Sequence, residues 1–209
     1  MLILASASPR RRELLTQAGL EFVVEPSNID ETPLPAEPAA AYVQRVATEK
    51  AQAVCAAYRA RNPEAGPVIV LAADTAVVLP DALGEHGTIL GKPLNPVDAE
   101  RMLGLLSGRT HAVMTGIAAV VSSRPARVVA DVEITQVTFN VITPAEIEEY
   151  VATGEPLDKA GAYAIQGFAA RWIPRIEGDY FNVVGLPIAR VIALLAEAGQ
   201  EPVAESQAK

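Results

Sequence analysis

Cysteine and histidine are nearly absent from this chain. Its 209 residues include one cysteine, Cys55, and two histidines, His86 and His111. A single cysteine excludes an internal disulfide and any zinc site built from several cysteines, and the two histidines do not form an HExxH motif. We therefore expect a protein of a reducing compartment, with the cytoplasm as the default.

Long apolar runs and an excess of basic residues are missing as well. Half of the residues are hydrophobic, which is enough for a sizeable core, but no run is long enough to span a bilayer. The first apolar run is followed by arginines and not by a signal-peptide cleavage site. The formal net charge of -8 argues against broad nucleic-acid binding, which needs a basic surface. We expect no membrane or nucleic-acid partner, one domain over residues 1–199, and a flexible tail over 200–209.

Strand-like and helix-like segments alternate along the chain. Apolar runs predict strands, and helical spacing with start and stop signals predicts helices. The expected strands are 2–5, 22–24, 68–72, 110–121 and 128–141, and the expected helices are 11–18, 39–61, 98–106, 144–151 and 185–198. We expect the last two strands to pair around a turn near 124–125, a loop over 26–38 and a hairpin tip over 81–87. This order indicates an α/β fold with a mixed sheet.

Three arginines gather directly after the first apolar run. Ser6 and Ser8 precede Pro9, and a predicted helix opens with Arg10, Arg11 and Arg12. The N–H groups at a helix start are unpaired and carry partial positive charge, so hydroxyls and guanidinium groups beside them form a seat for phosphate. The alternative is a solvated first turn capped by Ser8.

Two acidic and two further basic residues stand where chemistry is common. Asp74 follows the apolar run 68–72, and ligands bind at strand ends in open α/β sheets. Glu31 lies in a proline-flanked loop, Lys50 lies on the long helix, and Lys92 follows a glycine. A turn aspartate and a solvated acidic loop are the plain alternatives. Together these residues fit a metal-assisted attack on a polyphosphate, in which carboxylates hold a divalent ion and lysines neutralise phosphates.

The common nucleotide-binding motifs are absent. The segment 87–92 does not have the spacing of a Walker A loop, and the chain has no GxGxxG motif. A different dense cluster spans 158–167, where charges, small residues and an amide occur together. Gln166 can read both a donor and an acceptor on a base edge. A tight loop packed on a sheet would account for the glycines equally well.

The order of these motifs closely resembles that of the Maf-type nucleoside triphosphate pyrophosphatases, the septum-formation Maf proteins. The similarity runs in family order from Ser6 to Pro187, which is nearly the full length. The matching segments are Ser6-x-Ser8-Pro9-Arg10-Arg11, Glu13-Leu14-Leu15, Asp30-Glu31, Glu49-Lys50-Ala51, Ala73-Asp74-Thr75, Gly91-Lys92-Pro93, Leu106-Ser107-Gly108-x-x-His111, Thr115-Gly116, Glu155-x-x-Asp158-Lys159-Ala160-Gly161-Ala162-Tyr163-x-Ile165-Gln166-Gly167, Gly178-Asp179-Tyr180 and Val184-Gly185-Leu186-Pro187.

The resemblance implies a fold and a reaction. The fold is an elongated mixed β-sheet with flanking helices, in two lobes around a cleft, as in the inosine triphosphatase group. The reaction is hydrolysis of a nucleoside triphosphate to the monophosphate and pyrophosphate with a divalent metal cation, Mg²⁺ or Mn²⁺. The resemblance makes Asp74 the proton acceptor and, with Glu31, a metal ligand. It assigns further active-site positions to Ser6, Arg11, Lys50 and Lys92.

The resemblance also bears on the choice of substrate. Arg10, Thr75 and Gln166 match the branch of the family that acts on dTTP and UTP, with modified pyrimidine nucleotides included, and Lys159 is a further expected substrate-binding residue. The branch acting on 7-methyl-GTP typically has Trp, Gln and Glu at the first three positions. The alternatives are the same chemistry on 7-methyl-GTP or another purine, and a non-catalytic interaction role in septum formation. A homodimer is compatible with either.

Overall fold

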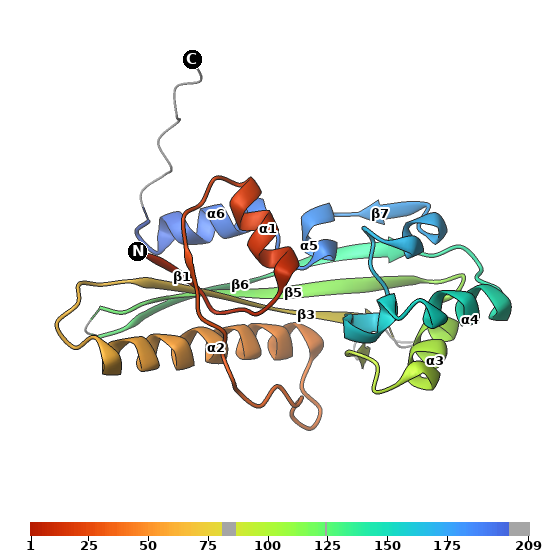
Figure 1. The fold of residues 1–209 in the computed structure, drawn as a ribbon, viewed down its shortest axis with the longest axis horizontal. Helices are drawn as coiled ribbons and strands as arrows, with labels where there is room; N and C mark the ends of the chain where they lie inside the picture. The colour runs from red at the N-terminus through yellow and green to blue at the C-terminus, as the bar shows by residue number, and fades with distance from the viewer. Residues whose placement is uncertain (81–86, 124, 201–209) are drawn as a thin grey trace, which may run out of the picture.

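The computed structural model describes residues 1–80, 87–123 and 125–200. One mixed sheet runs along the long axis of the molecule, with helices on both faces (Figure 1). The strands are β1 (Leu2–Leu4), β2 (Val23–Val24), β3 (Ile69–Leu79), β4 (Thr88–Leu90), β5 (Thr110–Val121), β6 (Arg127–Thr138) and β7 (Arg175–Glu177). The helices are α1 (Pro9–Gln17), α2 (Ala39–Arg61), α3 (Pro96–Leu106), α4 (Pro144–Ala152), α5 (Tyr180–Val184) and α6 (Ile188–Glu197).

The sheet combines parallel and antiparallel pairing. Its strand order is β2-β1-β3-β5-β6-β7, with β4 paired to the far end of β3. The first three strands in this order are parallel, and β5, β6 and β7 follow in antiparallel pairs. The ladder of β5 and β6 extends from Thr110 opposite Thr138 to Val121 opposite Arg127. The expected α/β fold with a mixed sheet and a long strand pair is therefore confirmed.

Successive side chains of β3 point to opposite faces of the sheet and pack into two different hydrophobic clusters. Val70 and Ala72 face α2 in one cluster, whereas Leu71 and Ala73 face α1 and α6 in another. A third cluster at the other end of the sheet includes α3 and α4. In Figure 1, α2 lies along one face of the sheet and α1 with α6 on the other, while α3 and α4 gather at one end. By the same alternation, the side chains of Asp74 and Thr75 lie on opposite faces of the sheet.

Several predicted element boundaries are wrong, and two of these have a clear structural cause. Strand β3 continues through Asp74 to Leu79 because its pairing with β5 extends to Val78, so Asp74 lies inside a strand and not at its end. The final helix begins at Ile188 and not at 185, because Gly185 has a φ of 123°. The short elements β4, β7 and α5 were not predicted, because three to five residues carry little periodicity.

Several predictions fall outside the described residues. The expected hairpin tip includes 81–86, the expected turn includes 124, and the tail includes 201–209, so the single domain with a flexible tail stays a prediction. No helix in the described ranges combines the length and apolar character needed to cross a membrane.

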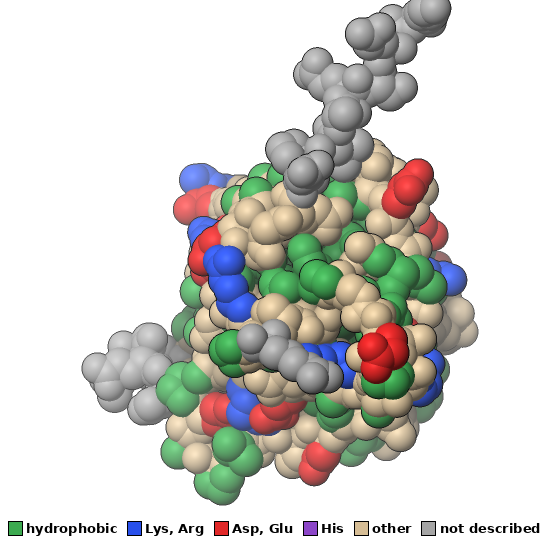
Figure 2. Space-filling model, turned by 90° about the vertical axis from the view of Figure 1, so that its left-hand side faces the viewer, with side chains coloured by type: hydrophobic (Ala, Val, Ile, Leu, Met, Phe, Trp, Pro, Cys, Tyr) green, Lys and Arg blue, Asp and Glu red, His purple; other side chains and the backbone are tan. Residues whose placement is uncertain are grey.

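At the end of the molecule opposite α3 and α4, acidic and basic side chains are interspersed with hydrophobic ones (Figure 2).

Candidate active site

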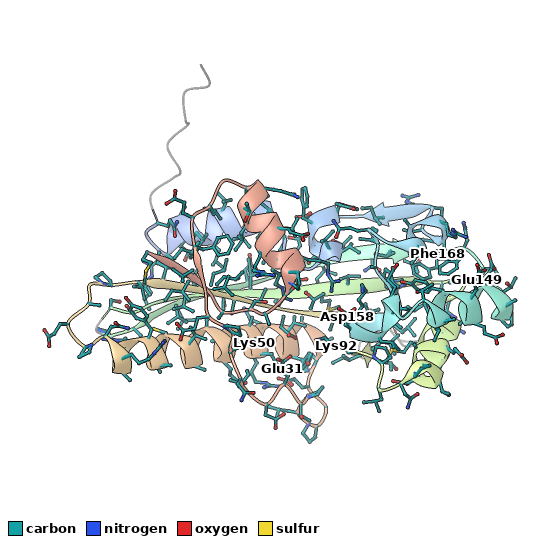
Figure 3. All side chains as sticks on the ribbon, viewed as in Figure 1. Glu31, Lys50, Lys92, Glu149, Asp158 and Phe168 are labelled. Atoms are coloured by element: carbon teal, nitrogen blue, oxygen red, sulfur yellow. The ribbon has the colours of Figure 1, made fainter. Side chains whose placement is uncertain are left out.

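A cavity of about 510 Å³ lies where β3, the start of α1 and the segment before β7 meet. All ten residues assigned to the site from the sequence line this one cavity, whereas Arg12, the third arginine of the expected phosphate seat, does not. The ten are Ser6, Arg10, Arg11, Glu31, Lys50, Asp74, Thr75, Lys92, Lys159 and Gln166. The labelled Glu31, Lys50, Lys92 and Asp158 gather near the middle of the molecule (Figure 3). The fold thus brings together residues from six separate stretches of the chain.

Lys50 is buried among apolar side chains on the inner face of α2. The buried positions of this helix follow helical spacing, and Lys50 takes one place in the stripe formed by Val43, Val46, Ala47, Lys50, Ala51, Val54 and Cys55. Its Nζ lies 2.8 Å from Asp74 Oδ1 and 3.0 Å from Glu31 Oε2. A buried ammonium requires partners of opposite charge, and these two carboxylates supply them.

Asp74 is a buried carboxylate beside two cationic side chains. Burial raises the pKa of its carboxyl group, and the nearby Lys50 and Arg11 oppose that rise. A raised pKa makes the carboxylate a stronger base than an exposed aspartate. Its side chain is 10% exposed and borders the cavity, so a water molecule or a ligand can reach it.

Arg11 is largely engaged within the protein. Its Nε donates to Gly185 O at 2.9 Å, and Nη1 donates to Ala73 O at 2.8 Å and to Ser6 Oγ at 3.4 Å. Its Nη2 donates to Thr75 Oγ1 at 3.1 Å. Four of the five N–H groups of a guanidinium are thereby used. Arg11 therefore acts mainly as a brace that joins α1 to β3 and to the loop before α6.

The hydroxyl of Thr75 belongs to a chain of hydrogen bonds that joins α1, β3 and β5. It accepts from Arg11, and its Oγ1 lies 2.9 Å from Thr115 Oγ1 on β5. Thr115 in turn donates to Asn182 O at 3.3 Å. Thr75 Oγ1 also lies 3.5 Å from Gly185 O, so each hydroxyl has a carbonyl acceptor and either one can donate to the other. Sequence reasoning missed this role of Thr115, whose only signal is its place in the Thr115-Gly116 pair.

The helix start beside Arg11 has the expected cap. Ser8 precedes α1, and its side chain accepts from the backbone N–H of Arg11. Pro9 occupies the first turn, so α1 begins two residues earlier than predicted. Arg10 lies on the cavity wall at this helix start. The N-terminus of α1 thus faces the cavity with its partial positive charge.

The segment that carries Gln166 rests on buried aromatic residues. Tyr163 OH lies 2.8 Å from His111 Nε2 on β5, and both side chains are buried. Burial lowers the pKa of His111 to about 4, so its ring is neutral near pH 7. Gln166 is exposed, three residues beyond Tyr163. The aromatic pair therefore anchors this segment, and sequence reasoning assigned His111 no such role.

The same segment contacts the loop that carries Lys92. The backbone N–H of Gly161 donates to Gly91 O at 3.0 Å. Gly161 has a φ of 68°, and a Cβ there would lie 2.8 Å from a methyl group of Val77. Only glycine fits this approach to β3. The neighbouring Lys159 Nζ contacts Asp158 Oδ1 at 2.6 Å on the cavity wall.

A metal ion has two candidate ligands in this cavity. Asp74 and Glu31 both contact the single ammonium group of Lys50, so their carboxylates converge. The described residues hold no cluster of three or more histidine, cysteine, aspartate or glutamate side chains suited to a metal. Magnesium is commonly bound by one or two carboxylates together with substrate phosphates. The donor set therefore fits a cation that arrives with a nucleotide.

Comparison with known proteins assigns the family. The model of the Maf family, described as Maf-like protein, matches residues 1–198. A dTTP/UTP pyrophosphatase of Moorella thermoacetica is 52% identical over 198 residues, which cover 95% of both chains. A dTTP/UTP pyrophosphatase of Anaeromyxobacter sp. is 52% identical over 202 residues, which cover 95% of this chain and 89% of that protein.

A further relative and one solved structure complete the comparison. A dTTP/UTP pyrophosphatase of Koribacter versatilis is 48% identical over 198 residues, which cover 95% of this chain and 94% of that protein. A crystal structure of a nucleoside-triphosphatase / dITP/XTP pyrophosphatase from Mycobacterium abscessus aligns with 96% of this chain and 97% of its own, at 14% identity and a TM-score of 0.42. That score is too low to support a conclusion. The match along residues 1–198 is decisive, and the chain belongs to the Maf family.

Proposed function

We propose that this chain hydrolyses dTTP and UTP, and modified pyrimidine nucleotides of the same kind, to the monophosphate and pyrophosphate. The observation that carries the proposal is the buried Lys50 ammonium between Asp74 and Glu31, at the wall of a cavity lined by further cations. The relatives that are about half identical over 95% of the chain are named dTTP/UTP pyrophosphatases, which supports this substrate class.

The cationic residues are assigned to the triphosphate. Lys50 and Lys92 approach the cavity from α2 and from the loop after β4, and the N-terminus of α1 adds backbone N–H groups. Charge on the leaving pyrophosphate grows as its bond to the α-phosphorus breaks. Ammonium groups already in place stabilise that charge without reorganising. Ser6, braced by Arg11, would contribute a hydroxyl to the same phosphates.

Asp74 is assigned to the attacking water. The oxygen of the water forms a bond to the α-phosphorus while the bond from that phosphorus to the bridging oxygen of the pyrophosphate breaks. The water proton passes to the Asp74 carboxylate, whose raised pKa favours accepting it. The products are the nucleoside monophosphate and pyrophosphate, and Asp74 then returns its proton to solvent.

A divalent cation, Mg²⁺ or Mn²⁺, is part of this proposal. Asp74 and Glu31 would hold it together with phosphate oxygens, since the two carboxylates converge on one point. When bound, the cation would neutralise phosphate charge and polarise the reacting phosphoryl group. Lys50 would then exchange a carboxylate partner for a phosphate oxygen.

The base is assigned to the part of the cavity that Gln166 lines. Uracil and thymine present an N–H between two carbonyl groups, and the amide of Gln166 can match one donor and one acceptor. Arg10 supplies further donors, and Lys159 also lines the cavity. Because nucleoside triphosphates are cytoplasmic metabolites, we place the protein in the cytoplasm. Neither nucleic acid nor a membrane is needed as a partner.

A nucleotide panel tests the proposal. dTTP, UTP, CTP, dATP, dGTP and 7-methyl-GTP are compared in Mg²⁺ and in Mn²⁺, with pyrophosphate and orthophosphate measured separately. The proposal predicts pyrophosphate release, with dTTP and UTP preferred over the purine nucleotides. Release of orthophosphate alone would contradict the reaction, and a preference for 7-methyl-GTP would contradict the substrate.

A further inference from the structure

The segment that carries Glu31 has no regular structure of its own. Residues 25–38 lie between β2 and α2 as an irregular loop, and the Glu31 side chain is 50% exposed. An irregular exposed loop keeps one position only where specific contacts hold it. The contacts that hold this loop in place come mainly from one face of α2.

Arg45 of α2 makes most of these contacts. Its Nε donates to Glu37 Oε1 at 2.6 Å, and its Nη2 donates to Glu37 Oε2 at 2.8 Å. The same Nη2 donates to the backbone carbonyl of Thr32 at 3.2 Å, next to Glu31 in sequence. Arg45 thus binds the loop at two points, Thr32 and Glu37, which lie five residues apart. The remaining nitrogen, Nη1, pairs with Glu49 Oε2 at 3.1 Å.

The pair of Arg45 and Glu37 is well shielded from solvent. The side chains are 23% and 9% exposed, and two parallel hydrogen bonds join them. The bonds from Arg45 lower the pKa of Glu37 to about 2, so the pair persists throughout the neutral pH range. Bidentate pairs of this kind are geometrically specific as well as strong. Lysine could not reproduce this geometry.

Two further residues of α2 act on Glu31 itself. Tyr42 OH donates to the backbone carbonyl of Glu31 at 3.0 Å, and Lys50 contacts its carboxylate. Tyr42, Arg45 and Glu49 recur at helical spacing, so they share one face of α2. Glu31 is therefore held through its own carbonyl, through that of Thr32 and through its carboxylate.

We propose that Arg45 is a positioning residue that fixes the 25–38 loop so that the Glu31 carboxylate meets Lys50 in the active site. This proposal rests on the proposed function, in which Glu31 acts on the nucleotide and its cation. Arg45 does not line the cavity. Its effect on the reaction should therefore pass entirely through Glu31.

A double-mutant cycle tests that dependence. Arg45→Ala and Glu31→Gln are made singly and together, and kcat/KM for UTP is measured at fixed metal concentration. We expect Arg45→Ala to lower kcat/KM about tenfold in the wild-type background and less than about twofold in the Glu31→Gln background, because coupled residues are not additive. Equal losses in the two backgrounds would overturn the proposal, and so would a wild-type rate in Arg45→Ala.

Amide hydrogen exchange of residues 27–37 provides a readout that does not depend on activity. Exchange should accelerate in Arg45→Ala and, to a smaller extent, in Arg45→Lys. The matched control is Arg101→Ala, which removes another doubly hydrogen-bonded arginine, whose Nε and Nη2 both donate to Asp98 Oδ1 on α3. It should leave exchange in 27–37 and kcat/KM unchanged. Unchanged exchange of residues 27–37 in both Arg45 variants would overturn the proposal even if Arg45→Ala loses activity.

The outcomes separate this proposal from the proposed function. If the wild-type protein releases no pyrophosphate from any nucleotide, the proposed function fails, and hydrogen exchange alone decides whether Arg45 fixes the loop. If Glu31→Gln keeps the wild-type rate, the role of Glu31 fails and the positioning proposal is overturned with it. If Glu31→Gln is slow and Arg45→Ala adds its full loss to it, only the positioning proposal fails.

Discussion

Gly116 lies directly opposite Asp74 in the ladder of β3 and β5. A Cβ at Gly116 would overlap the backbone carbonyl of Val43, so the missing side chain lets α2 approach the sheet closely at this point. Lys50 lies two turns further along α2 and reaches Asp74 at 2.8 Å. The short distance between ammonium and carboxylate thus depends on a glycine in the neighbouring strand.

The first prediction concerns that glycine. Gly116→Ala should lower the free energy of unfolding by about 1–3 kcal/mol, because α2 must shift to admit a methyl group. It should also slow pyrophosphate release, since the shift moves Lys50 away from Asp74. Urea denaturation and steady-state kinetics measure the two effects. Gly104→Ala on α3 is the control, because a Cβ there meets nothing within 4 Å. Equal stability of the two variants would contradict the packing argument.

The second prediction separates the two lysines. Lys50→Met and Lys92→Ala should each lower kcat by about 100-fold, because each removes a cation near the leaving group. Only Lys50→Met should alter the pH profile. Lys50 lowers the pKa of Asp74, so its loss should raise that pKa further and move the acid limb of kcat/KM to higher pH.

The measurement for this pair of variants is kcat/KM against pH at constant ionic strength. Wild-type rates in both variants would show that neither lysine contributes to catalysis. An acid limb that moves equally in both would show that Lys50 does not act on Asp74 in particular.

The third prediction concerns the buried His111. The pKa of His111 in the folded state is about 4, which is below the ordinary value of 6.5. The neutral ring therefore contributes fully to the free energy of unfolding above pH 6.5, and this contribution is lost as the pH falls toward 4. Between pH 7.5 and pH 5 this amounts to about 2 kcal/mol. His111→Gln should lose less stability than the wild type over that interval. Urea denaturation at the two pH values tests this, and parallel losses would contradict it.

The fourth prediction concerns base choice. Gln166→Glu replaces an amide donor with a carboxylate, so the ratio of kcat/KM for UTP over 7-methyl-GTP should fall by about tenfold or more. Adding Arg10→Trp and Thr75→Gln should lower the ratio further. Thr75→Gln also breaks the chain from Arg11 to Thr115, so the triple variant should be less stable than the single one. Gln136→Glu, at an exposed position on β6, is the control. An unchanged ratio in a folded triple variant would mean that the base is read elsewhere.

Long periodic segments were predictable from the sequence. The helix over 39–61 has the predicted bounds of α2, because a regular apolar stripe over many turns leaves little ambiguity. The continuation of β3 past Asp74 was not predictable in this way. Two polar residues interrupt its apolar run, and only the pairing with β5 shows that the strand continues. A functional carboxylate inside a strand breaks the local pattern that prediction depends on.

The sequence pointed to ten residues that line one cavity, but it did not predict how they are arranged there. Lys50 could be recognised as unusual because it stands in an apolar stripe. The ion pair of Arg45 and Glu37 could not be recognised from the sequence, because charged residues on a helix and in a loop ordinarily indicate solvated surface. The engagement of Arg11 with Gly185, far away in sequence, likewise depends on tertiary structure alone.

The most direct test of the account is the activity of Asp74→Asn. The amide keeps the size of the side chain but cannot accept the water proton or hold a cation as a carboxylate does. Pyrophosphate release from UTP and dTTP is measured by single turnover, and nucleotide binding is measured separately by calorimetry. The account predicts that release falls at least about 1,000-fold while UTP still binds. A fall of less than about tenfold, which is roughly 1.4 kcal/mol of barrier, would contradict the assignment of Asp74 as the proton acceptor.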